Sequence, residues 1–468
     1  MDLLFSCHLI QGGENVKIKV PQKVNEIIHR ITAHGYEAYA VGGCVRDAVL
    51  GRVPEDWDIT TSAKPEEVKS LFRRTIDTGI EHGTVTVMIE KEGFEVTTYR
   101  IDGEYEDGRH PKEVEFTASL EEDLKRRDFT INAMAYNESE GVIDLFDGMG
   151  DLQRGIIKCV GNPIERFSED ALRMLRGIRF AGQLGFTIDV GTREAMSIKA
   201  STIKKISAER IRVELDKLLR SQYPDKLKEA YKIGITSYIL PEFNQMIEAR
   251  QNNPHHCYDV GIHSLKAVEY MNKVAAERSM GVKEHSVLCW TALLHDVGKP
   301  VVMSTDEKGV DHFYNHALEG ERIGKKLLRR LKFDNYTINL VSHLVRWHDY
   351  PITLTRKSIR RCANKIGKEN MEFLFYMKEA DVYGQSDLEK EEKLKLIFNA
   401  REIYEQVVEA RECVNLKDLT VDGNDLIKIG ITPGKEIGIL LNTLLEKVLE
   451  NPELNKKEYL LEEVKKIL

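Results

Sequence analysis

The stretch Val41-Gly42-Gly43-Cys44-Val45-Arg46-Asp47, followed shortly by Glu55-Asp56-Trp57-Asp58-Ile59, decides the fold of the N-terminal part of the chain. An apolar strand that runs into two glycines and a helix lets backbone N–H groups approach a phosphate without obstruction by side chains. Arg46, one turn into that helix, can add a bidentate phosphate contact. Asp56 and Asp58 are two residues apart, so on a strand both carboxylates point to one side and Trp57 to the other. Because Mg²⁺ prefers carboxylates together with substrate phosphates, the stretch predicts a metal and nucleotide site.

Each half of this pattern also has an ordinary explanation. Two glycines before a helix are common, and they do not form the Gly-x-Gly-x-x-Gly dinucleotide pattern. An Asp-x-Asp pair usually ends a strand at a turn, and sugar-nucleotide transferases use such a pair too. The two halves together, with Arg46 between them, favour the nucleotide site.

Composition excludes several classes of protein. The chain has 468 residues, of which 42% are hydrophobic and 31% charged, so we expect about three globular domains rather than disorder. Its seven cysteines are scattered without a Cys-x-x-Cys pair, which argues against a disulfide framework or a cysteine zinc cluster. No apolar run approaches the roughly 20 residues of a membrane helix, and Asp2 stands where a signal peptide needs positive charge. We therefore expect a soluble, cytoplasmic protein without a membrane partner.

The net charge of −8 is unevenly distributed. Residues 1–150 carry −12, whereas 171–220 carry +6 and 321–370 carry +9. A polyanion would favour the two basic stretches and would need a cation to approach the first segment. The alternative is that these charges lie on solvated helix faces.

Local patterns predict a mixed α and β region followed by helices. Residues 24–32 have the periodicity of an amphipathic helix, and 45–50 have helical character. Strands are predicted at 37–41, 58–61, 84–90, 94–101 and 114–117. We expect one sheet with helices on one side over 20–150. From about residue 165 apolar residues recur at helical spacing almost to the C-terminus, so the fold class is α+β.

The order of motifs resembles the polymerase β-like nucleotidyltransferases, and more narrowly the class II tRNA nucleotidyltransferases. These are the CCA-adding enzymes and their bacterial poly(A) polymerase relatives. The resemblance rests on the stretches quoted above and continues over roughly residues 20–220. The further motifs are Arg126-Arg127-Asp128-Phe129-Thr130-Ile131-Asn132-Ala133-Met134, Asn162-Pro163-Ile164-Glu165-Arg166-Phe167, Glu169-Asp170-Ala171-Leu172-Arg173-Met174-Leu175-Arg176 and Ser207-Ala208-Glu209-Arg210-Ile211.

The resemblance implies a domain order. We expect an N-terminal extension (1–20), a nucleotidyltransferase head with a small sheet (21–155), and an all-α neck with a base-reading helix (156–222). A helical body (223–395) and a helical tail that binds tRNA (396–468) would follow. Asp56 and Asp58 would be catalytic and hold two Mg²⁺ ions. The residues expected to bind the nucleotide are Gly42, Gly43, Arg46, Arg127, Asp128, Asp170, Arg173, Arg176 and Arg179.

A physical argument supports base reading by Asp170 and Arg173, which lie one turn apart on a predicted helix and are expected to be neighbours. Cytosine and adenine present an amino donor beside a ring-nitrogen acceptor, and uracil and guanine present the reverse. An aspartate accepts from the amino group and an arginine donates to the ring nitrogen, so the pair would accept C and A. The alternative is an ion pair on a solvated helix face.

A second constellation consists of histidines and aspartates between residues 255 and 381. The pair His295-Asp296 ends an apolar helix over 287–294, a pattern that resembles the His-Asp (HD) superfamily of metal-dependent phosphohydrolases over about 255–390. The resemblance implies a site for a divalent metal of unknown identity and phosphatase or cyclic phosphodiesterase activity toward RNA ends or nucleotides. Its expected ligands are His263, His295, Asp296, His316, His348 and Asp381, with His348 preferred to His343. A scaffold that contacts tRNA and merely retains its metal is the alternative.

We therefore expect a CCA tRNA nucleotidyltransferase that takes CTP and ATP, uses tRNA as its partner and releases pyrophosphate. The segment 81–87 resembles that of CCA-adding enzymes, and the Gly-rich segment 102–114 resembles a loop that CC-adding enzymes lack. A CC-adding enzyme, an A-adding enzyme or a poly(A) polymerase of the same family remains an alternative. A phosphohydrolase with a passive RNA-binding head is another. The sequence leaves open whether the protein is a monomer or a homodimer.

Overall fold

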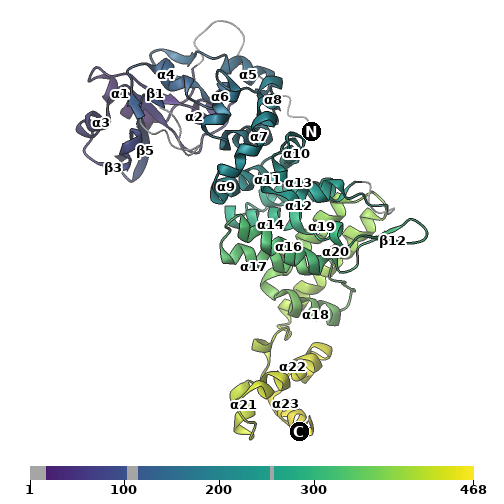
Figure 1. Ribbon diagram of the computed structural model, residues 1–468. Helices are drawn as coiled ribbons and strands as arrows, with labels where there is room; N and C mark the ends of the chain where they lie inside the picture. Colours follow the sequence, from purple (N-terminus) through teal and green to yellow (C-terminus); the bar gives the residue numbers. More distant parts are fainter. Residues whose placement is uncertain (1–16, 103–113, 253–257, 468) are drawn as a thin grey trace. The chain divides into compact units, whose positions relative to one another are not determined.

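The computed structural model describes residues 17–102, 114–252 and 258–467 (Figure 1). The Gly-rich loop expected at 102–114 thus lies almost entirely outside the described residues. The chain divides between Ile239 and Leu240 into two compact units, which are described separately below. Within the described part of the chain, every helix is too short or too polar to span a lipid bilayer.

The first unit contains a seven-stranded sheet in the order β3-β4-β5-β2-β1-β8-β9. Neighbouring strands are antiparallel except β2 and β5, which are parallel. The strands of this sheet are β1 (Ala38–Val41), β2 (Ile59–Thr61), β3 (Thr75–Gly79), β4 (Thr84–Ile89), β5 (Glu92–Thr98), β8 (Met134–Asn137) and β9 (Gly141–Asp144). Three two-stranded ladders pair β6 (Arg100–Asp102) with β7 (Val114–Phe116), β10 (Ile156–Ile157) with β11 (Thr187–Ile188), and β12 (Ser304–Thr305) with β13 (Asp311–His312), the last in the second unit.

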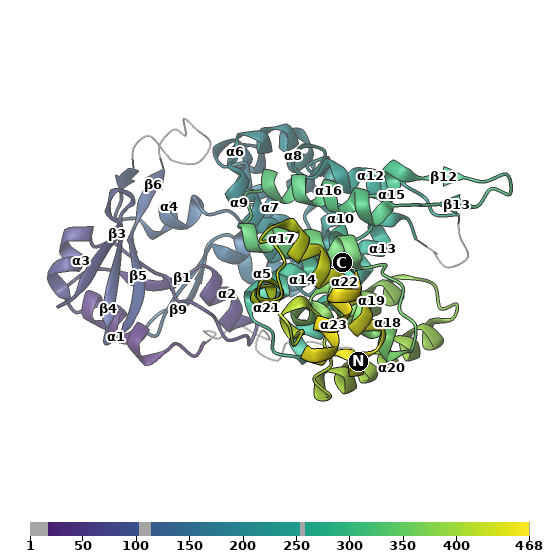
Figure 2. The ribbon, with the colours of Figure 1, turned by 90° about the horizontal axis from the view of Figure 1, so that it is seen from below.

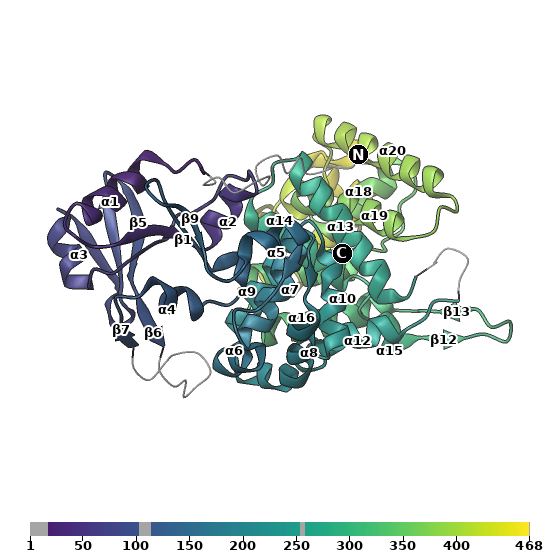
Figure 3. The ribbon, with the colours of Figure 1, turned by 90° about the horizontal axis from the view of Figure 1, so that it is seen from above.

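Strand β1 lies at the centre of the first unit and is buried on both faces. On one side, α1 packs against β1 and β2 (Figure 3). This helix buries Val24, Ile27 and Ile31. On the other side, Tyr39 and Val41 share a core with Leu124 of α4. The expectation of helices on one side of the sheet is therefore wrong, because α4 covers part of the second face.

Four helices of the first unit precede or alternate with the strands of the sheet, and α5 to α11 follow it. They are α1 (Gln22–Thr32), α2 (Gly43–Val49), α3 (Pro65–Leu71), α4 (Leu120–Lys125), α5 (Gly148–Arg154), α6 (Pro163–Glu169), α7 (Leu172–Leu184), α8 (Val190–Lys199), α9 (Ala208–Leu219), α10 (Leu227–Ile233) and α11 (Thr236–Ile239). Asn162 caps α6 by accepting from the N–H of Ile164, and proline occupies the first position of the helix. Helices α7 and α9 pack on each other through the apolar stripe that the sequence predicts for α7.

The second unit is helical apart from the hairpin of β12 and β13 (Figure 2). Its helices are α12 (Pro241–Glu248), α13 (Val260–Glu277), α14 (Val282–Leu294), α15 (Lys299–Val302), α16 (His316–Arg330), α17 (Asn335–Trp347), α18 (Arg356–Ile366), α19 (Met371–Gly384), α20 (Lys390–Glu409), α21 (Gly423–Lys428), α22 (Lys435–Glu450) and α23 (Lys457–Ile467). Helices α13, α14 and α19 pack on one another, and Trp290 of α14 is fully buried. Phe375 of α19 is buried in a core that also contains residues of α18 and α20. The last three helices have a hydrophobic core of their own around Leu444 and Leu460.

Candidate functional site

The two glycines after β1 form a tight turn into α2, as the sequence predicts. Gly42 has a φ of +87°, a conformation that a residue with a Cβ adopts only under strain. A Cβ on Gly42 would also lie 3.1 Å from Nη1 of Arg127. The turn therefore brings the backbone close to an arginine of the next motif.

Asp56 and Asp58 lie immediately before β2 rather than on it, because that strand begins only at Ile59. Their alternation nevertheless holds: both carboxylates are exposed, whereas Trp57 between them is buried. The N–H of Val41 donates to the carbonyl of Asp58 (3.0 Å), which holds this segment beside the end of β1. Although the Asp58 side chain is open to solvent on one side, desolvation and the charge of Asp56 raise its pKa to about 6.

All the head residues singled out in the sequence line one cavity of about 450 Å³. Its lining consists of Gly42, Gly43, Arg46, Asp56, Asp58, Arg126, Arg127, Asp128, Asn132, Asp170, Leu172, Arg173, Arg176, Arg179, Phe180 and Arg210. Seven arginines against four aspartates leave the lining with a net charge of +3, which suits a triphosphate. Sequence reasoning assigned no role to Arg126, Asn132, Leu172, Phe180 or Arg210.

A buried carboxylate organises the paired arginines of the cavity. Asp123, on α4, has no exposed surface and accepts from Nε and Nη2 of Arg126 (2.9 and 2.8 Å) and from Nη2 of Arg127 (3.2 Å). Burial opposes its ionisation, but Arg127 and Arg126 outweigh burial and hold the pKa of Asp123 below its ordinary value. Asp123 is thus a positioning residue beneath the cavity, and its place three residues before Arg126 on α4 was a local signal for that role.

Asp128 joins the head to helix α7. Its carboxylate accepts from Nε of Arg176 (2.7 Å), from the amide of Asn132 (3.2 Å) and from the N–H of Phe129 (2.9 Å). Burial opposes the charge, but Arg176 and these hydrogen bonds lower the pKa of Asp128 to about 2. Asp128 is therefore ionised, and it fixes Arg176, one of the arginines that line the cavity.

Arg46 lines the cavity, but its donors are engaged by protein groups. Nε and Nη2 donate to the two oxygens of Asp47 (2.9 and 2.8 Å), and Nη1 donates to Oδ1 of Asn132 (2.7 Å). The bidentate phosphate contact expected for Arg46 stays a prediction; Nη1 and Nη2 each carry a second N–H beyond those used by Asn132 and Asp47.

The two residues predicted to read the base are each held by a partner other than the one the helix spacing suggests. Asp170 accepts from Nη2 of Arg210, on α9 (2.6 Å), and from the N–H of Leu172 (2.9 Å). Arg173 forms an ion pair with Glu169 and donates from Nη2 to the carbonyl of Arg126 (3.1 Å). Both side chains are therefore oriented by groups from outside the pair.

Phe180 is a buried aromatic residue among the arginines. The guanidinium carbons of Arg179, Arg46 and Arg176 lie 3.9, 5.0 and 5.4 Å from the centre of its ring. Arg179 also donates from Nε to Glu214 (2.6 Å). Because the face of an aromatic ring attracts cations, Phe180 offsets the mutual repulsion of three like charges.

The second unit brings all six predicted histidines and aspartates together. His263 comes from α13, His295-Asp296 from the end of α14, His316 from the start of α16, His348 from the end of α17 and Asp381 from α19 (Figure 1). One group of candidate ligands comprises His263, His295, Asp296 and Asp381, and a second comprises Asp296, His316 and His348. The two groups share Asp296.

The imidazoles of this histidine centre present the same nitrogen to its middle. Nδ1 of each donates to a backbone carbonyl at 2.8–2.9 Å, namely that of Gly384, Ala292, Phe313 or Val345. Nε2 is then the atom with the lone pair, which is how metal-binding histidines are usually held. Nε2 of His263 lies 3.0 Å from that of His295, and Nε2 of His316 lies 3.3 Å from that of His348.

The charged groups of this centre interact strongly: burial opposes the charged form of His295, but Asp296 and Asp381 outweigh burial and raise the pKa of His295 to about 10. Oδ2 of Asp296 is buried and forms an ion pair with Lys299 (2.7 Å) but no hydrogen bond. Burial opposes ionisation of Asp296, yet His295 and Lys299 hold its pKa well below the ordinary value. Burial lowers the pKa of His348 to about 3, so this imidazole is neutral, as a metal ligand must be.

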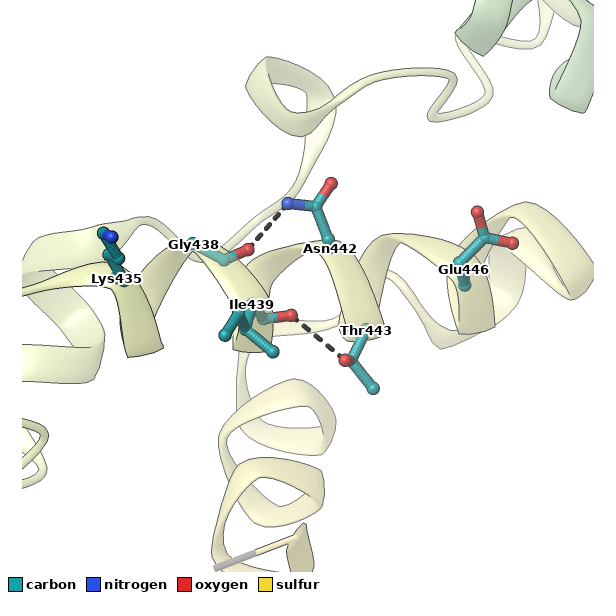
Figure 4. Close-up of a pocket in the computed structure, with 6 residues that line it drawn as sticks. All are labelled: Lys435, Gly438, Ile439, Asn442, Thr443 and Glu446. Carbon is teal, nitrogen blue, oxygen red and sulfur yellow. Dashed lines mark hydrogen bonds between the residues drawn. The ribbon is translucent and has the colours of Figure 1, made fainter.

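Other candidate positions lie elsewhere. Nε2 of His343 contacts the carbonyl of Ile366 (2.8 Å), away from the centre, and Nε2 of His285 contacts Asn272. A hollow on α22 is lined by Lys435, Gly438, Ile439, Asn442, Thr443 and Glu446 (Figure 4). In that hollow Asn442 and Thr443 donate to carbonyls of their own helix, so these two groups do not converge on a ligand.

Comparison with known proteins gives three family matches. Residues 38–158 match the "Poly A polymerase head domain", 185–247 match the "Probable RNA and SrmB- binding site of polymerase A", and 316–464 match "tRNA nucleotidyltransferase domain 2". The CCA-adding enzyme of Lactiplantibacillus plantarum is 36% identical over 94% of this chain and 95% of its own length. The CCA-adding enzyme of Enterococcus faecalis is 35% identical over 96% of this chain and 97% of its own length. The crystal structure of the Bacillus stearothermophilus CCA-adding enzyme in complex with CTP aligns with a TM-score of 0.70 and 28% identity, covering 95% of this chain and 98% of that one.

Proposed function

Because the chain belongs to the family of CCA-adding enzymes, we propose that it adds C, C and A to the 3′ end of tRNA from CTP and ATP. The observation that carries the proposal is the cavity of the first unit, which joins two carboxylates, seven arginines and the predicted base-reading pair. The relatives named above cover nearly the whole chain, which supports the same activity here.

Asp56 and Asp58 fit divalent cations. Their exposed carboxylates lie on the same side of one segment, and desolvation together with the charge of Asp56 raises the pKa of Asp58 to about 6, a repulsion that a bound cation would relieve. We propose that they hold two Mg²⁺ ions, which would activate the terminal 3′-hydroxyl and stabilise the departing pyrophosphate. The 3′-oxygen forms a bond to the α-phosphorus, and the bond from that phosphorus to the pyrophosphate oxygen breaks.

The other residues of the cavity would bind and orient the nucleoside triphosphate. Arg127, fixed by Asp123, faces the turn at Gly42 and would hold the triphosphate. Asp170 would accept from the amino group of C or A, and Arg173 would donate to the ring nitrogen. Uracil and guanine would leave these groups unpaired, which costs about 1–3 kcal/mol for each buried group.

We further propose the domain order expected from the sequence: head (21–155), neck (156–222), body (223–395) and tRNA-binding tail (396–468). The family match at 38–158 supports the head, and the positive charge of 171–220 and 321–370 supports contacts with tRNA phosphates. Several arginines of the second stretch are already paired, including Arg360 with Glu412 and Arg330 with Glu242. The basic residues outside these ion pairs would therefore contribute most to the binding of tRNA.

Incorporation assays test the proposal. Purified protein with Mg²⁺ receives tRNA transcripts that end before CCA or after CC, first with each nucleoside triphosphate singly and then with CTP and ATP together. We expect two Cs followed by one A, with U and G rejected. Addition of two Cs without A would show a CC-adding enzyme. Addition of a single A, and only to transcripts that end in CC, would show an A-adding enzyme. A long ladder of added A residues would show a poly(A) polymerase. Absence of any incorporation would contradict the proposal and leave a phosphohydrolase with a passive head.

We propose a second activity, metal-dependent phosphohydrolysis, for the histidine centre. Four Nε2 atoms face one another in pairs at 3.0 and 3.3 Å, and the two groups of candidate ligands share Asp296, an arrangement that supports a bound cation. The centre would hold a divalent metal that activates water, which would add to phosphorus while the ester oxygen leaves with a proton. Metal analysis of the wild type and of the variant His295→Ala, with hydrolysis of adenosine 2′,3′-cyclic phosphate, tests this. Equal metal content in the two proteins would contradict it.

A further inference from the structure

His312 on β13 and Tyr314 just after it directly precede His316, a candidate ligand of the histidine centre, in the chain. The rings of His312 and Tyr314 are stacked, with centroids 5.5 Å apart and planes 6° from parallel. Tyr314 is 72% exposed, so most of its ring is available to a ligand. Neither residue is part of the two candidate ligand groups.

The hairpin is firmly built. The carboxylate of Asp306 accepts from the N–H groups of Lys308 and Val310 (2.9 and 3.0 Å) and contacts Nε2 of His312 (3.0 Å). The buried Asp311 accepts from the hydroxyl of Thr305 (2.7 Å) and from the N–H of Asn252 (2.8 Å). The stacked rings are thus held in place before any ligand arrives, which lowers the entropic cost of binding.

The residue between the two rings connects them to the centre. The carbonyl of Phe313 accepts from Nδ1 of His316 (2.9 Å) and so orients that candidate ligand. The ring of Phe313 lies 5.3 Å from Nζ of Lys299, which pairs with Asp296. Only Asn315 separates Tyr314 from His316, so their Cα atoms are at most about 7 Å apart.

We propose that Tyr314, backed by His312, is a nucleobase-stacking subsite of the histidine centre, whose substrate is then a nucleoside phosphate ester. This rests on the hydrolytic function proposed above for that centre. Every nucleobase has an apolar face that stacks on aromatic side chains, so the subsite would recognise a base without selecting one. The ligand could be a free nucleotide or the 3′ end of an RNA chain, which share this chemistry.

A comparison of substrates with and without a base tests the subsite. Hydrolysis of adenosine 2′,3′-cyclic phosphate is measured beside that of glycerol 1,2-cyclic phosphate, which has no base. We expect Tyr314→Ala to raise KM for the nucleotide about 5- to 100-fold and to leave the glycerol ester within about twofold. Tyr314→Phe should behave as the wild type, as should the control Tyr336→Ala, which removes a tyrosine that is 53% exposed on α17. An equal effect on both esters, or none, would overturn the proposal.

A third arm uses an oligoribonucleotide that ends in a 2′,3′-cyclic phosphate. A larger effect of Tyr314→Ala on this substrate than on the mononucleotide would assign RNA ends as the ligand. Equal effects would show that one nucleoside is sufficient.

Photocrosslinking tests the subsite without depending on hydrolysis. The full-length protein is irradiated with 8-azidoadenosine 5′-monophosphate, digested with trypsin and analysed by mass spectrometry. We expect an adduct on the peptide Gly309–Arg322, which contains Tyr314, and its loss in Tyr314→Ala. Adducts confined to peptides of the first unit would overturn the subsite. An adduct on Gly309–Arg322 without hydrolysis in the wild type would support the subsite and contradict the hydrolase.

Discussion

Replacement of Arg210 by methionine should weaken the discrimination between C or A and U or G. Asp170 is held at one oxygen by the N–H of Leu172 (2.9 Å) and at the other by Nη2 of Arg210 (2.6 Å). Without Arg210 the second oxygen is no longer oriented toward the amino group of the base. The methionine side chain is of similar length, so the packing of α9 against α7 is largely retained.

The magnitude follows from the contact. A hydrogen bond to a charged group contributes about 1.5–3 kcal/mol. Only one of the two contacts is short, since the other, from Nη1 of Arg210 to Asp170, is 3.5 Å, and the two side chains are 24% and 14% exposed. We therefore expect the loss of this contact to cost about 1–2 kcal/mol of discrimination, which corresponds to about a 5- to 30-fold fall in selectivity.

The assay measures kcat/KM for CTP and for UTP on a tRNA transcript that lacks CCA. We expect the CTP to UTP ratio to fall about 5- to 30-fold in Arg210→Met, with tRNA affinity within twofold of the wild type. The control Arg30→Met removes an arginine that pairs with Glu26 on α1, outside the cavity, and should leave the ratio unchanged. An unchanged ratio in Arg210→Met would refute the positioning of Asp170 by Arg210.

Three further predictions concern the remaining parts of the two sites. Because the pKa of Asp58 is raised to about 6 and only its ionised form binds a cation, the apparent affinity for Mg²⁺ should fall as the pH decreases through 6; a pH-independent Mg²⁺ titration would contradict this. Phe180→Leu should raise KM for CTP about 5- to 30-fold through lost cation–π contacts while Phe180→Tyr does not, and steady-state kinetics in which both variants match the wild type would refute the ring's role. His295→Ala should leave CCA addition within twofold, because the centre and the cavity lie in different units, and a loss of incorporation would show that the two activities are coupled.

The sequence predicted the parts of the fold that local chemistry determines. The turn at Gly42, the helix that follows it and the opposite orientation of Trp57 relative to its acidic neighbours all depend on residues adjacent in the chain. Strands β3, β8 and β9 were not predicted, and 94–101 proved to be two strands, β5 and β6, instead of one. Strand β8 (Met134–Asn137) is completely buried, so it lacks the alternation of polar and apolar residues by which half-buried strands are recognised.

The same limit applies to the candidate sites. The predicted residues could be found because they belong to short motifs that follow one another in a recognisable order along the chain. The structure gathers the residues predicted to bind the nucleotide in one cavity and the histidines in one centre. Their distant partners could not be found, since a helical spacing rule identifies only neighbours three or four residues apart, such as Glu169 and Arg173. That rule pairs Asp170 with Arg173, whereas the structure holds Asp170 through Arg210, which is 40 residues away. It also gives no reason to assign Phe180, an ordinary core residue by its pattern, to a group of arginines.

If Asp170 and Arg173 read the base as proposed, the partners that hold them would allow these side chains to act as a template. A pair of side chains can select a base by its hydrogen-bond pattern only if its donors and acceptors keep their directions when the wrong base is present, because mobile groups would rotate to satisfy any base. Glu169 and the carbonyl of Arg126 restrain Arg173, and Arg210 with the N–H of Leu172 restrains Asp170. Selectivity for the base should therefore depend also on residues that never touch the base. The variant Arg210→Met tests this, because selectivity would not change in that variant if Asp170 and Arg173 acted alone.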